Sequence, residues 1–257
     1  MRAQQVPSSA GWRWLLGGFA LYRRAPLTYS MLVMTYWFVV VFLNVVPVLG
    51  ALLAAMVVPG LSVGLMQGAR HLERGLPIGL QTLFGGLKEN ARTLCLLGAL
   101  YLLVTLGILG VSSLFDGGDM LRYMLANSRA ERAAVEDADF LLPSLVVMTL
   151  LVPVMMAWWF APVLAGWHRQ SAAKALFFSF IACWMNWRAF LAYSVALMLF
   201  AMLLPGILLA LLMIVVPGAQ ELATTLILMP MLLIIAPSVF ASFYASYRDI
   251  FGISEIV

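Results

Sequence analysis

The chain has 257 residues, of which 64% are hydrophobic and only 10% charged, and its formal net charge is +4. Soluble domains hold about 45–50% apolar and about 25% charged residues, so this composition excludes a soluble globular core. The Lys and Arg residues are spread between apolar stretches, so we interpret them as a topology signal and expect no nucleic-acid partner.

Six apolar stretches are each long enough to cross a bilayer core of about 30 Å as a helix. They cover residues 26–46, 48–69, 93–115, 141–165, 189–214 and 222–245. The pattern predicts an all-α integral membrane protein that forms a single membrane domain over residues 1–257. Short turns with Pro or Gly join the first two and the last two stretches, which predicts three hairpins of transmembrane helices.

A short amphipathic segment precedes each hairpin, with apolar residues spaced three and four apart. The apolar stripes are Trp12, Leu15, Leu16, Phe19 and Tyr22, then Leu80, Leu83, Phe84 and Leu87, then Leu176, Phe177, Phe180, Ile181 and Trp184. We expect three interfacial helices in the cytoplasmic headgroup layer. Each helix with its hairpin forms one unit of a weak repeat, over residues 9–69, 77–165 and 171–250.

Each amphipathic segment ends in an elbow rich in Arg, Asn or Trp. The elbow residues are Arg23, Arg24, Asn90, Arg92, Asn186, Trp187 and Arg188. Such side chains can bind lipid headgroups and the backbone groups left open at helix ends. We therefore predict that the elbows lie at the membrane interface.

Small residues recur every four positions in the second helix of each hairpin. In the first two hairpins they are Gly60, Gly64, Gly68, Ala157, Ala161 and Ala165. Small residues let helix backbones approach closely in lipid, so we predict that the three units pack through these faces.

The charges also predict the orientation. Of the fifteen Lys and Arg, only Arg122, Arg129 and Arg132 lie in the connection of the middle hairpin, which also holds most of the acidic residues. By the positive-inside bias, both termini are expected in the cytoplasm. A surface helix is expected at residues 120–125, and an exposed charged segment at residues 129–139.

Groups that carry chemistry are scarce in the predicted spans, which contain no Asp, Glu or His. We therefore predict no catalytic residues, no cofactor and no metal site. His71 and His168, beside Arg70 and Arg169, could bind an anion when protonated, although such residues more often anchor a helix at the interface. Isolated cysteines provide no metal or redox motif.

Uncharged polar residues and prolines leave a transport role open. Asn44 and Gln67 could line a solute path together with carbonyls freed by proline, as in transporters with discontinuous helices. The alternative is ordinary hydrogen bonding between helices. Kinks are expected in the fourth span, with Pro153 and Pro162, and in the sixth span, with Pro230 and Pro237.

The segments 11–14, 18–26 and 186–190 read GWRW, GFALYRRAP and NWRAF. They resemble an uncharacterised family of proteobacterial six-span inner-membrane proteins. More distantly, they are similar to YciC-like proteins and to the membrane domain of some glycerophosphodiester phosphodiesterases. The resemblance implies a bacterial inner membrane and brings no activity with it, because the soluble phosphodiesterase domain is absent.

We predict a non-enzymatic inner-membrane protein that organises or binds other components and contacts headgroups of the cytoplasmic leaflet. The expected partners are membrane lipids and a membrane protein or a second copy of the chain. The alternative is a secondary transporter or permease for a small apolar or amphipathic solute. A lipid-modifying enzyme ranks last.

Overall fold

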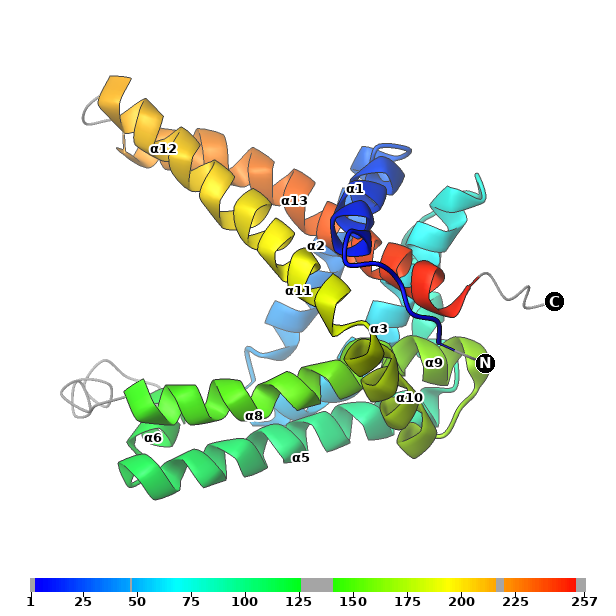
Figure 1. Ribbon diagram of the computed structural model, residues 1–257, viewed down its shortest axis with the longest axis vertical. Helices are drawn as coiled ribbons and strands as arrows, with labels where there is room; N and C mark the ends of the chain where they lie inside the picture. Colours follow the sequence, from blue (N-terminus) through cyan, green and yellow to red (C-terminus); the bar gives the residue numbers. More distant parts are fainter. Residues whose placement is uncertain (1–2, 47, 126–140, 216–219, 253–257) are drawn as a thin grey trace.

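The computed structural model describes residues 3–46, 48–125, 141–215 and 220–252, and all regular elements in these ranges are helical (Figure 1). The helices are α1 (Ala10–Tyr22), α2 (Pro26–Leu43), α3 (Leu49–Glu73), α4 (Leu80–Gly85), η1 (Gly86–Lys88), α5 (Ala91–Asp116), α6 (Asp119–Leu125), α8 (Leu141–Trp159), α9 (Ala161–His168), α10 (Ala172–Met185), α11 (Trp187–Met198), the π-helical segment η2 (Leu199–Leu203), α12 (Leu204–Val215) and α13 (Gln220–Phe251). The expected all-α class is therefore confirmed.

Five stretches of the described chain are long and apolar enough to cross a membrane. They are Pro26–Leu43, Leu49–Glu73, Ala91–Asp116, Leu141–His168 and Trp187–Ile214. Only 6% of the most apolar window of Trp187–Ile214 is buried within the protein, so most of this stretch presents side chains that require a hydrocarbon environment. The sequence predicts a sixth stretch at residues 222–245, which lies within α13 and is not among these five.

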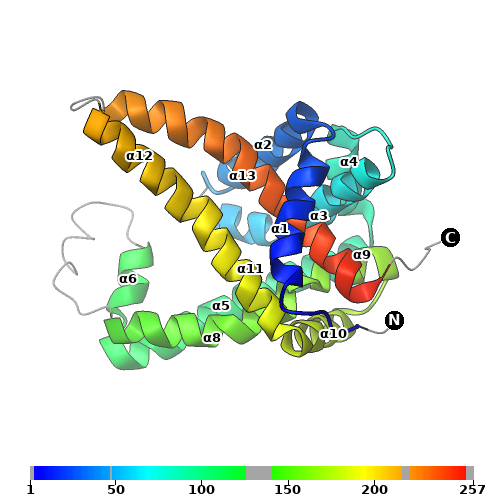
Figure 2. The ribbon, with the colours of Figure 1, turned by 45° about the horizontal axis from the view of Figure 1, so that its top comes forward.

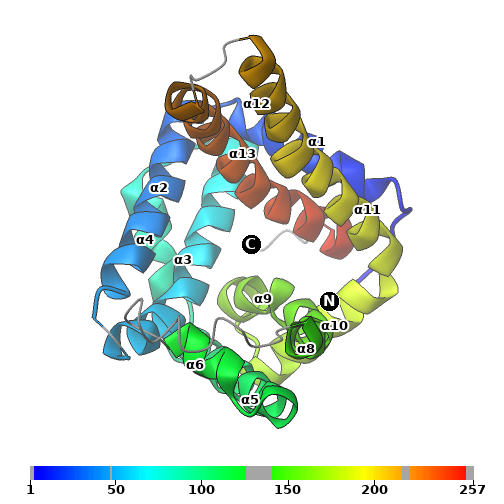
Figure 3. The same ribbon diagram turned by 90° about the vertical axis from the view of Figure 1, so that its left-hand side faces the viewer.

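Consecutive long helices contact one another as the pairs α2 with α3, α5 with α8, and α12 with α13, and α3 also packs against α5 and α13. Figure 3 shows these pairs around a common centre, with α3, α9 and α13 on the inner side. The large hydrophobic core lies where α3, α9 and α13 end, close to both chain termini. Because Arg70, Arg169 and Arg248 lie there, we call this part of the molecule the basic end.

The short helices pack in a cyclic order. α4 and η1 lie against α3, and α10 lies against α8 and α9. α1 lies against α13, from the opposite end of the sequence, and also against α11 (Figure 2). Each short helix thus packs on the last long helix of the preceding pair, and the cycle closes between α1 and α13.

The small residues of α3 lie at close contacts with neighbouring helices. A Cβ atom on Gly64 would collide with the carbonyl oxygen of Leu83 in α4, and one on Gly60 would meet Leu87 in η1. Gly68 faces the ring of Tyr29 in α2. We predicted that the units pack through these small faces. Gly60 and Gly64 lie against the short helix of the second unit, whereas Gly68 faces a helix of its own unit. Their space is filled by a short helix and by the paired helix α2.

The alanines of the fourth span differ in burial. Ala161 and Ala165 in α9 are buried, whereas Ala157 in α8 is only half-buried. The two helices are separated at Phe160, two residues before Pro162. The kink expected in this span thus appears as a break, while α13 runs as one helix through Pro237.

The connection after α5 contains the expected short helix. α6 packs its Met120 and Leu121 against Ile108, Leu109 and Val147 of α5 and α8. The charged segment expected at residues 129–139 lies outside the described residues.

Candidate functional site

The first two elbows hold the ends of long helices. Arg24 donates hydrogen bonds from Nη1 to the carbonyl oxygens of Leu72 and Glu73, at 2.8 and 2.9 Å, where α3 ends. Asn90 donates from Nδ2 to the carbonyl oxygen of Ala165 in α9, at 2.9 Å. Asn90 has a left-handed backbone, with φ at 49°, which asparagine tolerates better than most residues. Both side chains satisfy carbonyl groups near helix ends.

The third elbow forms hydrogen bonds with the N-terminal segment that precedes α1. Asn186, which is buried, donates from Nδ2 to the carbonyl oxygens of Ala182 and Gln4, and its Oδ1 accepts from the amide of Val6 at 2.8 Å. The amide of Gln4 donates to the carbonyl oxygen of Ile250 in α13, at 2.9 Å. The elbow is therefore linked to the end of α13 through one extended segment.

The remaining elbow residues point away from the core. The guanidinium of Arg188 lies 5.4 Å from the ring centre of Trp187, and that of Arg23 lies 5.9 Å from the ring of Phe19. Trp187 is 54% exposed, and Arg92 is also exposed. These cation–aromatic pairs present charge and ring surface outward.

Charged and aromatic side chains join the three inner helices at the basic end. Arg248 of α13 forms an ion pair with Glu73 of α3, and the hydroxyl of Tyr244 donates to the same carboxylate at 2.5 Å. The guanidinium of Arg70 lies 5.0 Å from the ring centre of Trp167 in α9. These contacts tie α3, α9 and α13 together.

The two histidines make separate contacts. The Nε2 atom of His168 lies 2.6 Å from the hydroxyl oxygen of Tyr247, and that of His71 lies 2.7 Å from the Nε2 atom of Gln67. Among the described residues no contact joins the two rings, so the structure does not support the anion site that the sequence left open for them.

Asn44 and Gln67 do not come together either. Asn44 is exposed at the end of α2 and donates to the carbonyl oxygen of Val40, one turn earlier. Gln67 contacts His71 on its own helix. Neither residue lines the cavity that lies between α3, α5, α8, α9 and α13. The polar lining expected from Asn44 and Gln67 is therefore absent from that cavity.

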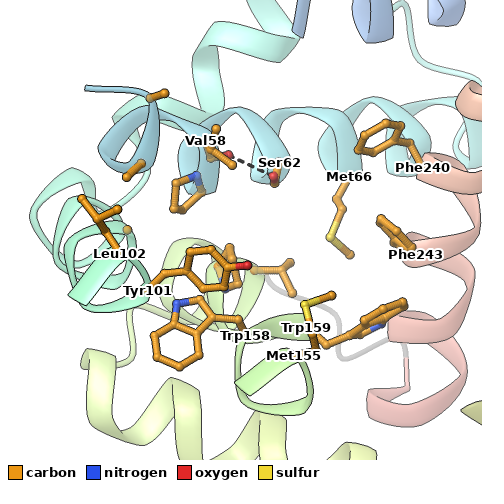
Figure 4. Close-up of a pocket in the computed structure, with 16 residues that line it drawn as sticks. Val58, Ser62, Met66, Tyr101, Leu102, Met155, Trp158, Trp159, Phe240 and Phe243 are labelled. Carbon is orange, nitrogen blue, oxygen red and sulfur yellow. Dashed lines mark hydrogen bonds between the residues drawn. The ribbon is translucent and has the colours of Figure 1, made fainter. Parts of the chain in front are cut away.

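A cavity of about 400 Å³ lies between α3, α5, α8, α9 and α13. Figure 4 shows Tyr101 and Trp158 at one end and Phe240 and Phe243 at the other, with Met66 between them. The wall is almost wholly apolar, and no charged side chain of the described chain lines it. Its size is that of an ordinary small-molecule pocket.

Glycine and proline shape one wall. Pro59 removes the amide that would bond to the carbonyl of Ala55. Gly98 of α5 packs directly on that carbonyl, because a Cβ there would collide with its oxygen. The close approach brings α5 against α3 beside the cavity.

A hydroxyl from α10 stabilises the break between α8 and α9. The Oγ atom of Ser179, which is fully buried, accepts from the amide of Phe160 at 2.9 Å and donates to the carbonyl oxygen of Met156 at 2.8 Å. The hydroxyl thus replaces the direct helical bond between these two backbone groups. A short helix outside the long pairs holds the cavity wall in shape.

One buried polar atom in the wall has no hydrogen-bond partner among the described residues. The indole Nε1 atom of Trp159 lacks a hydrogen bond, whereas that of Trp158 donates to the carbonyl oxygen of Leu97 at 3.0 Å. Sequence reasoning missed these residues. The available signal was a tryptophan pair within an apolar span, about three turns from the basic residues where membrane tryptophans usually gather.

The sequence was compared with known proteins. No family model matches the chain, and no solved structure matches it. The chain is 33% identical over 261 residues to a "probable inner membrane protein" of Burkholderia thailandensis, and the match covers 99% of this chain and 96% of that protein. The length and identity of the match, together with the apolar helices, show that the chain belongs to the family of this inner-membrane protein.

Proposed function

We propose that the protein is a non-enzymatic, multi-pass organiser of the bacterial inner membrane. Its six transmembrane helices, with α13 as the sixth, form three units over residues 9–69, 77–165 and 171–250. Both termini lie in the cytoplasm, and the basic end contacts headgroups of the cytoplasmic leaflet. As part of this proposal, the protein is distantly similar to YciC-like proteins and to the membrane domain of some phosphodiesterases. We infer no activity from that similarity.

The observation that best supports the proposal is that large apolar side chains on the short helices face outward. On α10, Phe177 and Trp184 are 61% and 63% exposed, while the buried face consists of Ala172, Ala175, Ser179, Ala182 and Cys183. On α1, Trp12 and Phe19 are likewise exposed. In water this arrangement would be unfavourable, but at a bilayer interface it places apolar side chains in the acyl region.

The polar groups at the basic end support a non-enzymatic role. Glu73 is engaged by Arg248 and Tyr244, and His168 is engaged by Tyr247. Groups that hold helices together in this way stabilise a scaffold. We propose that they serve as contacts between helices and not as a nucleophile with its base.

The orientation is tested with fused reporters. A reporter that is active only in the periplasm is expected to be active when fused after Arg129 and silent when fused after Arg169. The opposite pattern would reverse the proposed orientation.

Headgroup contact is tested by stability in nanodiscs. We expect phosphatidylglycerol to raise the unfolding temperature relative to phosphatidylcholine, and the double variant Arg23→Gln/Arg188→Gln to lose most of this gain. Arg122→Gln, which changes an exposed arginine on α6, is the matched control and should keep it. Equal gains in all three proteins would contradict the proposal.

The organising role is tested in native membranes. A photocrosslinking amino acid at position 184, on the exposed face of α10, should capture a membrane protein or a second copy of the chain. The same substitution at position 183, on the buried face, should not. Capture of lipid alone from position 184 would argue against a protein partner on this face.

The cavity supports a second candidate, a permease for a small apolar or amphipathic solute. Its apolar wall and the break beside it are features that a solute path could use. Proteoliposomes should then take up the solute faster than empty liposomes. Val58→Trp, which fills the cavity, should abolish the difference.

A further inference from the structure

The cavity opens within the apolar part of the molecule. Tyr101 and Met155, which line it, are 36% and 47% exposed. Both residues lie within helices long and apolar enough to span a membrane, several turns from Glu73 and His168. A molecule entering at this opening therefore comes from a hydrocarbon environment.

Water is a poor occupant of such a space. A water molecule in a cavity is held by several polar partners, and an apolar wall offers few of them. The cavity wall carries mainly aliphatic and aromatic surface, including Val58, Met66, Phe240 and Phe243. Since the cavity opens toward acyl chains, hydrocarbon is the occupant that its wall accommodates at least cost.

One buried polar group on the wall, the Nε1–H of Trp159, has no hydrogen-bond partner in the described part of the chain. A buried donor without a partner is costly, and most such groups in native proteins are satisfied. A ligand with an oxygen acceptor would satisfy the indole donor.

We infer that the cavity binds a single hydrocarbon chain that carries a carboxyl or ester oxygen, which accepts a hydrogen bond from Trp159. A free fatty acid and the acyl chain of a phospholipid share this chemistry. The absence of charged side chains from the described wall disfavours ions and sugars, which would lose hydration without compensation, so a fatty acid would bind in its neutral, protonated form. The aromatic rings around the space hold the chain by contact.

This inference deepens the second candidate function, because both use the same cavity, but binding does not require transport. It is independent of headgroup contact at the basic end. If the protein binds a hydrocarbon chain but takes up no solute, the permease function is contradicted and the inference stands.

The experiment uses the full chain, purified in detergent, and a palmitic acid that carries a mid-chain diazirine. After irradiation, peptide mass spectrometry should place the label mainly on residues of the cavity wall. Val58→Trp, which narrows the cavity from α3, should remove that label. Leu103→Trp, on an exposed position of α5 that does not line the cavity, is the matched control and should keep it.

The hydrogen bond is tested separately by competition with unlabelled ligands. Trp159→Phe should lower the affinity for palmitic acid about fivefold to tenfold, the effect of one lost hydrogen bond. The affinity for hexadecane should not change. Trp12→Phe, on the exposed face of α1, should change neither. Equal weakening of palmitate and hexadecane would overturn the role of the indole donor.

The competitor that displaces the label identifies the source of the bound hydrocarbon chain. Displacement by palmitate alone identifies a free fatty acid, and displacement by phosphatidylglycerol identifies a membrane phospholipid. Label spread evenly over the exposed helix faces, with no change in Val58→Trp, would overturn the inference. Unfolding temperatures of each variant show whether a loss of label reflects a loss of fold.

Discussion

The backbone amide of Phe160 donates a hydrogen bond to the hydroxyl of Ser179, which lies 19 residues later on a different helix. The same hydroxyl donates to Met156, so one side chain satisfies both backbone groups at the break between α8 and α9. The shape of the cavity therefore depends on α10, although α10 does not line it.

Removing this hydroxyl should destabilise the protein. Ser179→Ala leaves a buried amide and a buried carbonyl unpaired, and we expect a loss of about 1–3 kcal/mol in the free energy of unfolding, measured by denaturant titration in detergent. Ser246→Ala removes another buried hydroxyl, which bonds only within its own helix, and should cost less. Equal losses in both variants would show that the bridge adds nothing.

The close contact of α3 with α4 should not accept a methyl group. Gly64→Ala would drive a Cβ atom into the backbone of Leu83, and we expect a loss of about 1–3 kcal/mol. Gly107→Ala in α5 is the matched control, because no atom lies within 4 Å of its added Cβ atom. Helix propensity makes that change neutral or stabilising. Unfolding temperatures measured in one detergent compare the two variants.

The ion pair at the basic end should contribute modestly. The side chains of Glu73 and Arg248 are 23% and 37% exposed, so solvent screens part of their attraction. We expect Glu73→Gln to cost about 1 kcal/mol, with a smaller effect at high salt. Asp119→Asn breaks the more exposed pair with Arg122 and should have almost no effect. A double-mutant cycle with Arg248→Gln isolates the coupling, and a coupling of zero would contradict this role.

The two thiols should differ in reactivity. Burial raises the pKa of Cys183 to about 12, so at neutral pH this residue is a thiol and not the reactive thiolate. Because the folded-state pKa is raised, the difference persists throughout the physiological range and fades only as the pH approaches 12. A small maleimide should therefore label the exposed Cys95 in the native protein, and label Cys183 only after denaturation. Each single-cysteine variant is assayed by mass spectrometry, and rapid native labelling of Cys183 would refute the burial.

The sequence predicted the helical class and the positions of the short helices well, because apolar spacing reports helix periodicity directly. It could not show which face of a short helix meets protein. Trp12 and Trp14 are both aromatic and two residues apart, yet Trp12 is 42% exposed and Trp14 is 2% exposed. Lipid and protein interior are both apolar, so hydrophobicity does not distinguish them.

The cavity was beyond sequence reasoning for a different reason. Its wall combines side chains from five helices between Ala54 and Phe243, and no local spacing links them. The polar residues Asn44 and Gln67 attracted attention because they are rare in apolar spans, but each forms a hydrogen-bonding contact within its own helix or turn. The unpaired indole of Trp159 becomes visible only when its neighbours are known.

The cyclic packing has a consequence for biogenesis. α1 leaves the ribosome well before α13, but its buried face packs on α13, and Trp14 donates a hydrogen bond to Asp249 across 235 positions of sequence. α1 must therefore wait, without its main partner, until α13 has been made. A nascent protein that is truncated before α13 exposes the unfilled surface of α1, where membrane proteases and insertases can distinguish it from a finished molecule.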